Sequence, residues 1–112
     1  MEQISALQLA GIETQIAEFM LDRTSHRKTY GQLLDIFESS YEKMETDPSN
    51  DLRILQFSSE MEKGNWHNGI VVTCCQGIAV DGIHRGVAYL KCIRKGVAES
   101  TLPKLLVAVV EL

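Results

Sequence analysis

The residues best suited to chemistry gather in one short stretch, which runs from Asp81 to Arg85. An apolar run that predicts a strand ends at Asp81 and Gly82, and a helical pattern begins at His84. A helix that starts in this way presents free backbone N–H groups and the positive end of its dipole. Both features favour an anion, and a phosphate group is the usual one. The stretch therefore predicts a phosphate site.

Four residues of this stretch each have two interpretations, one structural and one functional. Asp81 caps the helix or occupies an Asp-Gly turn, or else it holds Mg²⁺ beside phosphate oxygens. Gly82 supplies a positive φ, or it lets a ligand approach the backbone. His84 and Arg85 are surface residues or phosphate donors, and the planar guanidinium of Arg85 suits bidentate binding. Two adjacent donors after Asp-Gly favour the phosphate site.

The composition limits the classes of protein to which the chain can belong. It has 112 residues, 45% hydrophobic and 23% charged, which is typical of one globular domain. The net charge of −4 argues against tight binding to nucleic acid, which needs clustered cations. The three cysteines do not resemble a disulfide framework, and a reducing, cytoplasmic setting is expected. Since no apolar run reaches about 20 residues, we expect no membrane partner.

The first part of the chain predicts helices. Apolar residues recur at helical spacing over residues 3–21, with Gly11 as a weak point where a break is expected to be easy. The polar segment 21–28 predicts a loop. A second helix is expected after Thr29, because Thr29 and Gln32 have the spacing of a capping box.

The second part of the chain predicts a mixture of helices and strands. Glycine residues and an Asp-Pro pair divide it into short segments of different periodicity. The predicted elements are a helix from Pro48 to about Gly64, a strand over 69–75, a hairpin turn at Gln76 and Gly77, a strand over 78–80, a helix over 84–95 and a strand over 105–110. The sequence therefore predicts a single α+β domain over residues 1–112.

Two separated elements carry a family resemblance. The Gly-x-Trp element at Gly64–Trp66 and the Asp-Gly-x-His-Arg motif at 81–85 resemble the ParB/sulfiredoxin-like superfamily. Together they are most similar to its branch of ATP- or ADP-dependent serine kinases. The resemblance covers about residues 45–110. It implies a ParB/sulfiredoxin-like core over 45–112, with a small mixed sheet and packed helices, and a helical N-terminal segment over 1–44.

Several features depart from the family pattern. Gly69 stands where the family often has proline. Ile83 stands where sulfiredoxins have their catalytic cysteine, so the resemblance does not imply reduction of a sulfinic acid. Chromosome-partitioning members continue into a helix-turn-helix domain, which this sequence does not include. The family usually opens with a short strand, whereas residues 3–21 predict a helix.

The resemblance also implies roles for individual residues. It implies that phosphates contact the motif and that a glutamate before the Gly-x-Trp helix orients or deprotonates a nucleophile. Glu45 fits that position best, with Glu42 as the reserve. The expected site residues are Glu45, Asp81 and His84 for catalysis, Gly82, Ile83, His84 and Arg85 for nucleotide binding, and Asp81 for the metal. The expected cofactors are ATP or another nucleotide and Mg²⁺.

Two functions from different classes remain open at this stage. The first is a nucleotide- or phosphate-binding domain, with Mg²⁺-dependent phosphoryl transfer or nucleotide hydrolysis as an ATP-dependent kinase or NTPase. The second is a non-enzymatic module for protein interaction or regulation of DNA transactions, as in plasmid partition, with a protein partner bound by the N-terminal helices. A nuclease is a third alternative. Trp66 and His67 either line the ligand cleft or, in the case of Trp66, anchor the core.

Overall fold

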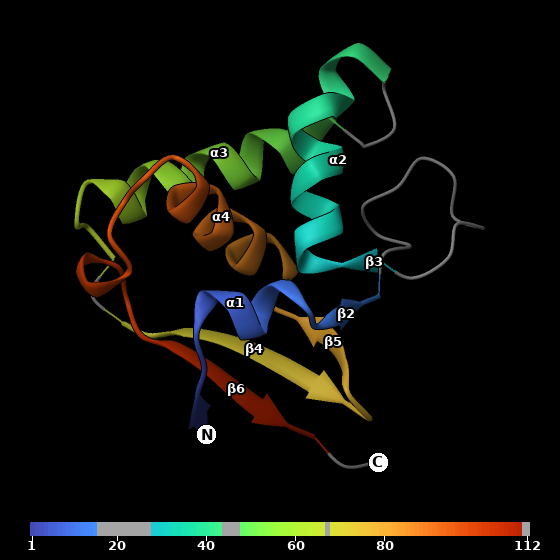
Figure 1. Cartoon of the computed structure of the whole chain (residues 1–112), viewed down its shortest axis with the longest axis vertical. Helices are drawn as coiled ribbons and strands as arrows, with labels where there is room; N and C mark the ends of the chain where they lie inside the picture. Colours follow the sequence, from blue (N-terminus) through green and yellow to red (C-terminus); the bar gives the residue numbers. More distant parts are fainter. Residues whose placement is uncertain (16–27, 44–47, 67, 111–112) are drawn as a thin grey trace.

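In the part of the chain that the structure describes, six strands form one mixed sheet, and the helices pack against one face of it (Figure 1). The computed structural model describes residues 1–15, 28–43, 48–66 and 68–110, with the backbone alone for 39–43 and 48–51. The described elements are β1 (Glu2–Gln3), α1 (Ala6–Ala10), β2 (Glu13–Thr14), β3 (Lys28–Thr29), α2 (Tyr30–Lys43), α3 (Pro48–Glu62), β4 (Ile70–Cys75), β5 (Ile78–Asp81), α4 (Ile83–Arg94), the 3₁₀-helix η2 (Glu99–Thr101) and β6 (Leu105–Val109).

The strand order is β1-β6-β4-β5-β2-β3. The central strand β4 runs parallel to β6 and antiparallel to β5. The short strand β2 runs parallel to β5, and β1 and β3 pair antiparallel with their neighbours. The predicted α+β class with a small mixed sheet is therefore confirmed.

Helix α4 lies at the centre of the helical layer, between α2, α3 and the sheet (Figure 1). Most of its residues are buried, and Tyr89 packs in the core with Leu9, Leu33 and Met61. Beneath it, Ile70 and other alternate residues of β4 point toward the helices. None of the described helices is both long and apolar enough to cross a membrane. The start of α4, which carries the predicted site, is thus fixed from several sides.

The predicted local signals of the later elements are present in the structure. The backbone N–H of Thr29 donates to the Gln32 side chain at 2.9 Å, and the N–H of Gln32 donates to the Thr29 hydroxyl at 3.2 Å. These bonds form the predicted capping box. The hairpin turn has positive φ at both Gln76 and Gly77, as a type I′ turn requires. The predicted helix from Pro48 is also confirmed.

The helix predicted over residues 3–21 is wrong for the part that the structure describes. Instead, β1, α1 and β2 follow one another, and residues 16–21 lie outside the described part. A capping box between Ser5 and Gln8 starts α1, and the turn at Gly11 ends it. The two short strands form because β6 and β5 offer open edges, which are partners from the far end of the sequence. Residues 1–44 are therefore not a purely helical segment.

The three cysteines are free, as the sequence suggested. Cys74 points into the core, and its neighbour Cys75 is partly exposed on the opposite face of the sheet. Cys92 is fully buried in α4, and its thiol donates to the carbonyl of Ser58 at 3.4 Å. Burial raises the pKa of the Cys92 thiol to about 11. Cys92 therefore packs as a core residue.

Candidate functional site

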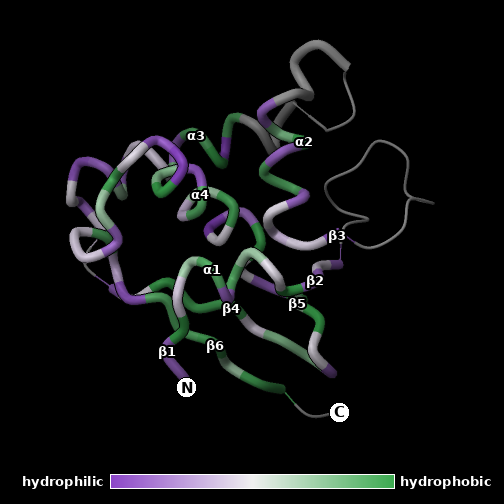
Figure 2. The backbone as a smooth tube through the Cα atoms, viewed as in Figure 1, coloured by the Kyte–Doolittle hydropathy of each residue, from purple (hydrophilic) through white to green (hydrophobic). Residues whose placement is uncertain are grey.

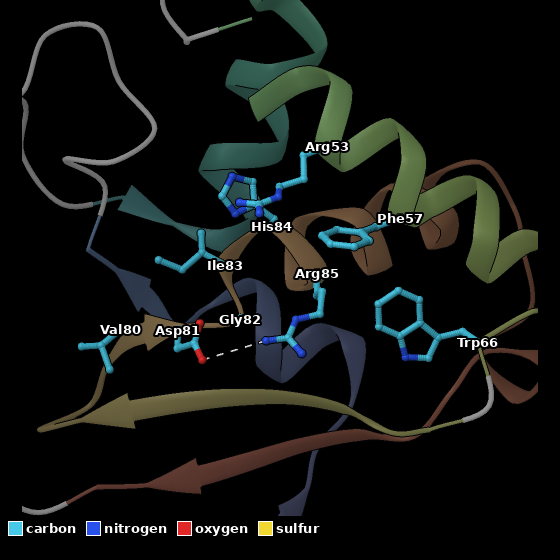
Figure 3. A pocket seen from close by; sticks show the side chains of 9 residues that line it. All are labelled: Arg53, Phe57, Trp66, Val80, Asp81, Gly82, Ile83, His84 and Arg85. Carbon is cyan, nitrogen blue, oxygen red and sulfur yellow. Dashed lines mark ion pairs between the residues drawn. The ribbon is translucent and has the colours of Figure 1, made fainter. Parts of the chain in front are cut away.

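The stretch predicted from the sequence lines a cavity of about 340 Å³ where β5, α3 and the start of α4 meet (Figure 3). The structure brings all five residues of the Asp-Gly-x-His-Arg motif to this one place. It also adds residues from a second, distant segment of the chain. The lining residues are Arg53 and Phe57 of α3, Trp66 of the following turn, Val80 and Asp81 of β5, Gly82, and Ile83, His84 and Arg85 of α4.

Gly82 fixes the turn from β5 into α4. Its φ of 80° lies in the left-handed region, and a Cβ atom there would collide with the carbonyl oxygen of Val71. Gly82, not Asp81, is the N-cap residue of α4, and no side chain caps the helix. The interpretation of Asp81 as a helix cap is therefore wrong. Only glycine satisfies both the backbone conformation and the close approach of β4.

A second glycine fixes the first turn of α4 against α2. Tyr30 is fully buried, and its ring fills the place that a Cβ atom of Gly86 would occupy. The Tyr30 hydroxyl donates to the carbonyl oxygen of Gly82 at 3.4 Å, and the backbone N–H of Gly86 donates to that same oxygen at 2.9 Å. The N-cap carbonyl is thus held from two sides. Sequence reasoning missed Gly86, because only the packed structure shows which ring it faces.

Three basic side chains meet in the cavity. Arg53 extends from α3 toward His84, and Arg85 lies between Asp81 and Trp66 (Figure 3). The Arg85 guanidinium is 4.0 Å from the Asp81 carboxylate, and 74% of the Asp81 side chain is exposed. An ion pair so long and so exposed adds little stability. The guanidinium therefore keeps most of its capacity for another anion.

His84 is half-buried, and its surroundings disfavour the protonated form of its imidazole. Burial, together with the charges of Arg53 and Arg85, lowers the pKa of His84 from 6.5 to about 4. At neutral pH the cavity thus holds two guanidinium charges and a neutral imidazole. An anion between these groups would reverse part of this shift, since a negative charge favours the protonated form. His84 and a bound phosphate would then support each other's charge.

An aromatic pair forms one wall of the cavity. The rings of Phe57 and Trp66 meet edge to face, with centroids 5.5 Å apart and an interplanar angle of 85°. Arg53 and Phe57 are one helical turn apart, so they share the face of α3 that looks toward α4. Trp66 both lines the cavity and packs against the core, which combines its two predicted roles. His67 lies outside the described residues.

A second hollow of about 360 Å³ adjoins the first, because both include Trp66 and Arg85 in their walls. Its other walls are polar. The amide nitrogen of Asn65 donates to a carboxylate oxygen of Glu60 at 3.2 Å. Asn68 and Gly69 complete the lining. Arg85 is thus the boundary between a cationic, aromatic cavity and a polar one.

The remaining predicted site residues differ in what the structure says of them. The side chain of Ile83 is 4% exposed and belongs to the core, which leaves its backbone to face a ligand. Glu45 lies outside the described residues, and so does the side chain of the reserve candidate Glu42. The described residues include no group of three potential metal ligands. Asp81 alone fits Mg²⁺ of the kind that is held by one carboxylate and by phosphate oxygens.

Sequence reasoning missed Val80, which adjoins the motif, and two lining residues of α3, Arg53 and Phe57. Their spacing of four positions on a predicted helix is a signal that they share a face. Nothing in that spacing shows which other element the face meets.

Comparisons with models of protein families, with curated proteins and with solved structures find no match for this chain. The functional argument therefore rests on the cavity itself.

Proposed function

We propose that this chain is a nucleotide-binding domain in which the start of α4 holds the phosphates. One observation carries the proposal: Arg53, His84 and Arg85 meet at a helix N-terminus in the same cavity as an aromatic pair. The cations suit the phosphate end of a ligand, and the aromatic wall suits a planar ring. Nucleotides combine these two chemistries in one molecule.

The phosphate end of the ligand fits the cavity by charge and by geometry. Guanidinium groups bind phosphate oxygens through paired, charge-assisted hydrogen bonds. The first backbone N–H groups of α4 have no side-chain cap, and the residues that carry them line the same cavity. The helix dipole adds to the attraction. Arg85, Arg53 and the Gly82 turn are therefore the proposed phosphate-binding elements.

The base end of the ligand fits the aromatic wall. Stacking of a base on an aromatic side chain is worth about 1–3 kcal/mol. The cavity volume of about 340 Å³ is at the lower end of the range for small-molecule sites, about 300–1,000 Å³. We therefore assign the base to Trp66 and Phe57, with part of the ligand left in solvent.

We also propose the ParB/sulfiredoxin-like superfamily as the family of this chain, because the order of its elements agrees with the sequence resemblance. The described chain opens with the short strand β1, which removes one of the departures seen in the sequence. The hairpin β4–β5, the glycine turn and α4 follow in the order that the resemblance implies. We include the family in the proposal on these grounds. A cytoplasmic setting suits the three free cysteines.

A phosphoryl-transfer or hydrolysis reaction is the proposed activity. Asp81 would hold Mg²⁺, which when bound neutralises phosphate charge. Arg85 and Arg53 stabilise the charge that develops on the transferred group. The polar hollow beside Arg85 offers an acceptor a path to the phosphates. Glu45 remains the proposed residue that orients or deprotonates the acceptor.

The alternative is a non-enzymatic module, with the N-terminal part as its contact surface for a protein partner. The first 15 residues are built into the domain, however. Ile4 donates to the carbonyl of Leu105 at 2.9 Å, and the N–H of Ala6 donates to Glu99 at 2.7 Å. Because these residues complete the sheet and the core, they are not a detachable accessory. We therefore favour nucleotide binding.

The test is a nucleotide panel with and without Mg²⁺, read by thermal shift and then by titration calorimetry. We expect at least one of ATP, ADP, CTP and GTP to raise the melting temperature, because a ligand of the native state stabilises it by mass action. Arg85→Ala removes charge-assisted hydrogen bonds worth about 1.5–3 kcal/mol, so affinity falls at least tenfold.

Arg94→Ala is the matched control, because Arg94 lies on the same helix but pairs with Asp35 and Glu38 away from the cavity. It should leave nucleotide affinity unchanged. If no nucleotide shifts the melting temperature and calorimetry shows no heat of binding, the proposed function is wrong. Equal losses in the two variants would also contradict the assigned site.

A further inference from the structure

The polar hollow beside the proposed nucleotide site has two residues in common with that site. Trp66 and Arg85 line both the cavity of about 340 Å³ and the hollow of about 360 Å³. In the proposed complex, Trp66 holds the base and Arg85 holds the phosphates. Because the ribose of a nucleotide links the base to the phosphates, it must lie next to both residues. The hollow is therefore the part of the surface that the ribose would meet.

The walls of this hollow have the chemistry that binds hydroxyl groups. Figure 2 shows the last turn of α3 and the segment after it as mainly hydrophilic, whereas β4 is hydrophobic. A carboxylate accepts hydrogen bonds, and a carboxamide both donates and accepts them. A sugar ring with free hydroxyl groups fits such a lining, and an apolar group does not. Apart from Trp66, the lining residues are Glu60, Asn65, Asn68, Gly69 and Arg85.

Helix α3 contributes the carboxylate of this hollow. Arg53, Phe57 and Glu60 have the spacing i, i+4 and i+7, so they lie along one face of the helix. The first two residues line the cavity, and Glu60 continues the same face into the hollow. This face of α3 therefore presents a cation, an aromatic ring and a hydrogen-bond acceptor, one after another.

The end of α3 holds the Glu60 carboxylate in place. Gly64 has a φ of 74°, and the backbone N–H of Asn65 donates to the carbonyl of Glu60 at 3.1 Å, as in the Schellman end of a helix. The Asn65 amide nitrogen also donates to the carboxylate oxygen Oε2 of Glu60 at 3.2 Å. No described residue donates to the other oxygen, Oε1. That oxygen is therefore available to a ligand.

We propose that Glu60 binds the hydroxyl groups of the ribose, so that the site takes ribonucleotides in preference to nucleotides without these hydroxyls. This inference rests on the proposed function, because it concerns the same ligand. Asn65 keeps the carboxylate in position and offers its own amide oxygen to the sugar. A site built to accept a hydrogen bond from a hydroxyl discriminates against an analogue that lacks it. The rest of the hollow stays open to the acceptor of the phosphoryl group.

Titration calorimetry of the whole chain tests the proposal with ATP, CTP and GTP and with their 2′,3′-dideoxy forms, which lack both ribose hydroxyls. Each ribonucleotide that binds should bind at least tenfold more tightly than its dideoxy form, as expected for a hydrogen bond to a carboxylate. In Glu60→Ala this preference should fall below about threefold. The ratio of the two affinities is the readout, because the loss of a negative charge shifts both affinities alike. Inorganic triphosphate reports on the phosphate contacts alone.

Glu62→Ala is the matched control, because it removes the same charge from α3 at a residue that pairs with Lys95 at 2.9 Å. It should keep the preference for ribonucleotides. Equal affinities of the native chain for both forms overturn this inference and leave the nucleotide site standing. A preference that persists in Glu60→Ala has the same meaning. If neither the nucleotides nor inorganic triphosphate bind, the proposed function is wrong, and this inference with it.

Discussion

The two ends of helix α4 carry basic residues in opposite electrostatic settings. At the C-terminal end, Arg94 lies 2.7 Å from the Asp35 carboxylate and 2.8 Å from that of Glu38. Lys95 lies 2.9 Å from Glu62. Hydrogen bonds to these carboxylates raise the pKa of both basic groups. The helix dipole favours cations at this end as well. The ion pairs and the helix dipole here both support the positive charge.

At the N-terminal end the interactions oppose the charge. The dipole disfavours cations there, and His84 and Arg85 face a third basic group, Arg53. The carboxylate that pairs with Arg85 is 4.0 Å away and mostly exposed. Burial lowers the pKa of His84 most, and the charges of Arg53 and Arg85 lower it further. Basic residues at this end destabilise the ligand-free protein, because their positive charges repel one another and the helix dipole. A bound anion would offset this repulsion, so such residues are expected at an anion-binding site.

The largest expected effect concerns the backbone that holds this end in place. Gly82→Ala forces a positive φ on alanine and a clash with Val71, and each costs about 1–3 kcal/mol. We expect the free energy of unfolding to fall by about 3 kcal/mol in urea titrations. Gly77→Ala is the control, because Gly77 also has positive φ but open space around it. Its cost should be about 1 kcal/mol. Equal losses would show that Val71 imposes no constraint.

The next prediction distinguishes binding of the nucleotide base from binding of the phosphates. Trp66→Leu keeps an apolar side chain but removes the π face, so nucleotide affinity should fall about tenfold. The affinity for inorganic pyrophosphate should stay within about twofold, because Arg53 and Arg85 are unchanged. Titration calorimetry with both ligands measures the two affinities. If the affinity for both ligands fell equally, Trp66 would maintain the shape of the cavity rather than contact the base.

A smaller effect is expected from pH. Because the folded-state pKa of His84, about 4, lies below its ordinary value of 6.5, the neutral form supports folding, and this contribution is lost as pH falls from 6.5 through 4. A bound anion raises the pKa of His84, so sulfate affinity should rise several-fold over the same fall in pH. Sulfate itself does not titrate there. His84→Gln should flatten the profile, and an unchanged slope would exclude His84 from the anion site.

The smallest effect is expected at the other end of the helix. Arg94→Ala removes two exposed ion pairs, and the free energy of unfolding should fall by about 0.5–1 kcal/mol. High salt should remove most of this difference, because it screens exposed charges. Urea titrations at low and high salt provide the measurement. If Arg94→Ala cost more than Gly82→Ala, the contrast between the two helix ends would be reversed.

The sequence predicted what local chemistry determines. The capping box at Thr29 and the turn at Gly77 act through neighbours a few residues away, and both were predicted correctly. The helix over 3–21 failed because the strands of that region depend on partners that no local pattern reveals. For the site, the motif from Asp81 to Arg85 was visible as one stretch. Arg53 and Phe57 were not, because packing alone decides which helix face reaches the cavity.

The position of β6 between β1 and β4 has a consequence for how the domain folds. Glu2 pairs with Val107, and Ile70 pairs with Leu105, so residues from near both ends of the sequence must meet before the sheet is complete. Such distant pairings lose much chain entropy before they gain contacts, which slows folding. The hairpin β4–β5 and the helices have local contacts and are expected to form first. Until β6 arrives, one edge of β4 stays open to incorrect pairing between chains.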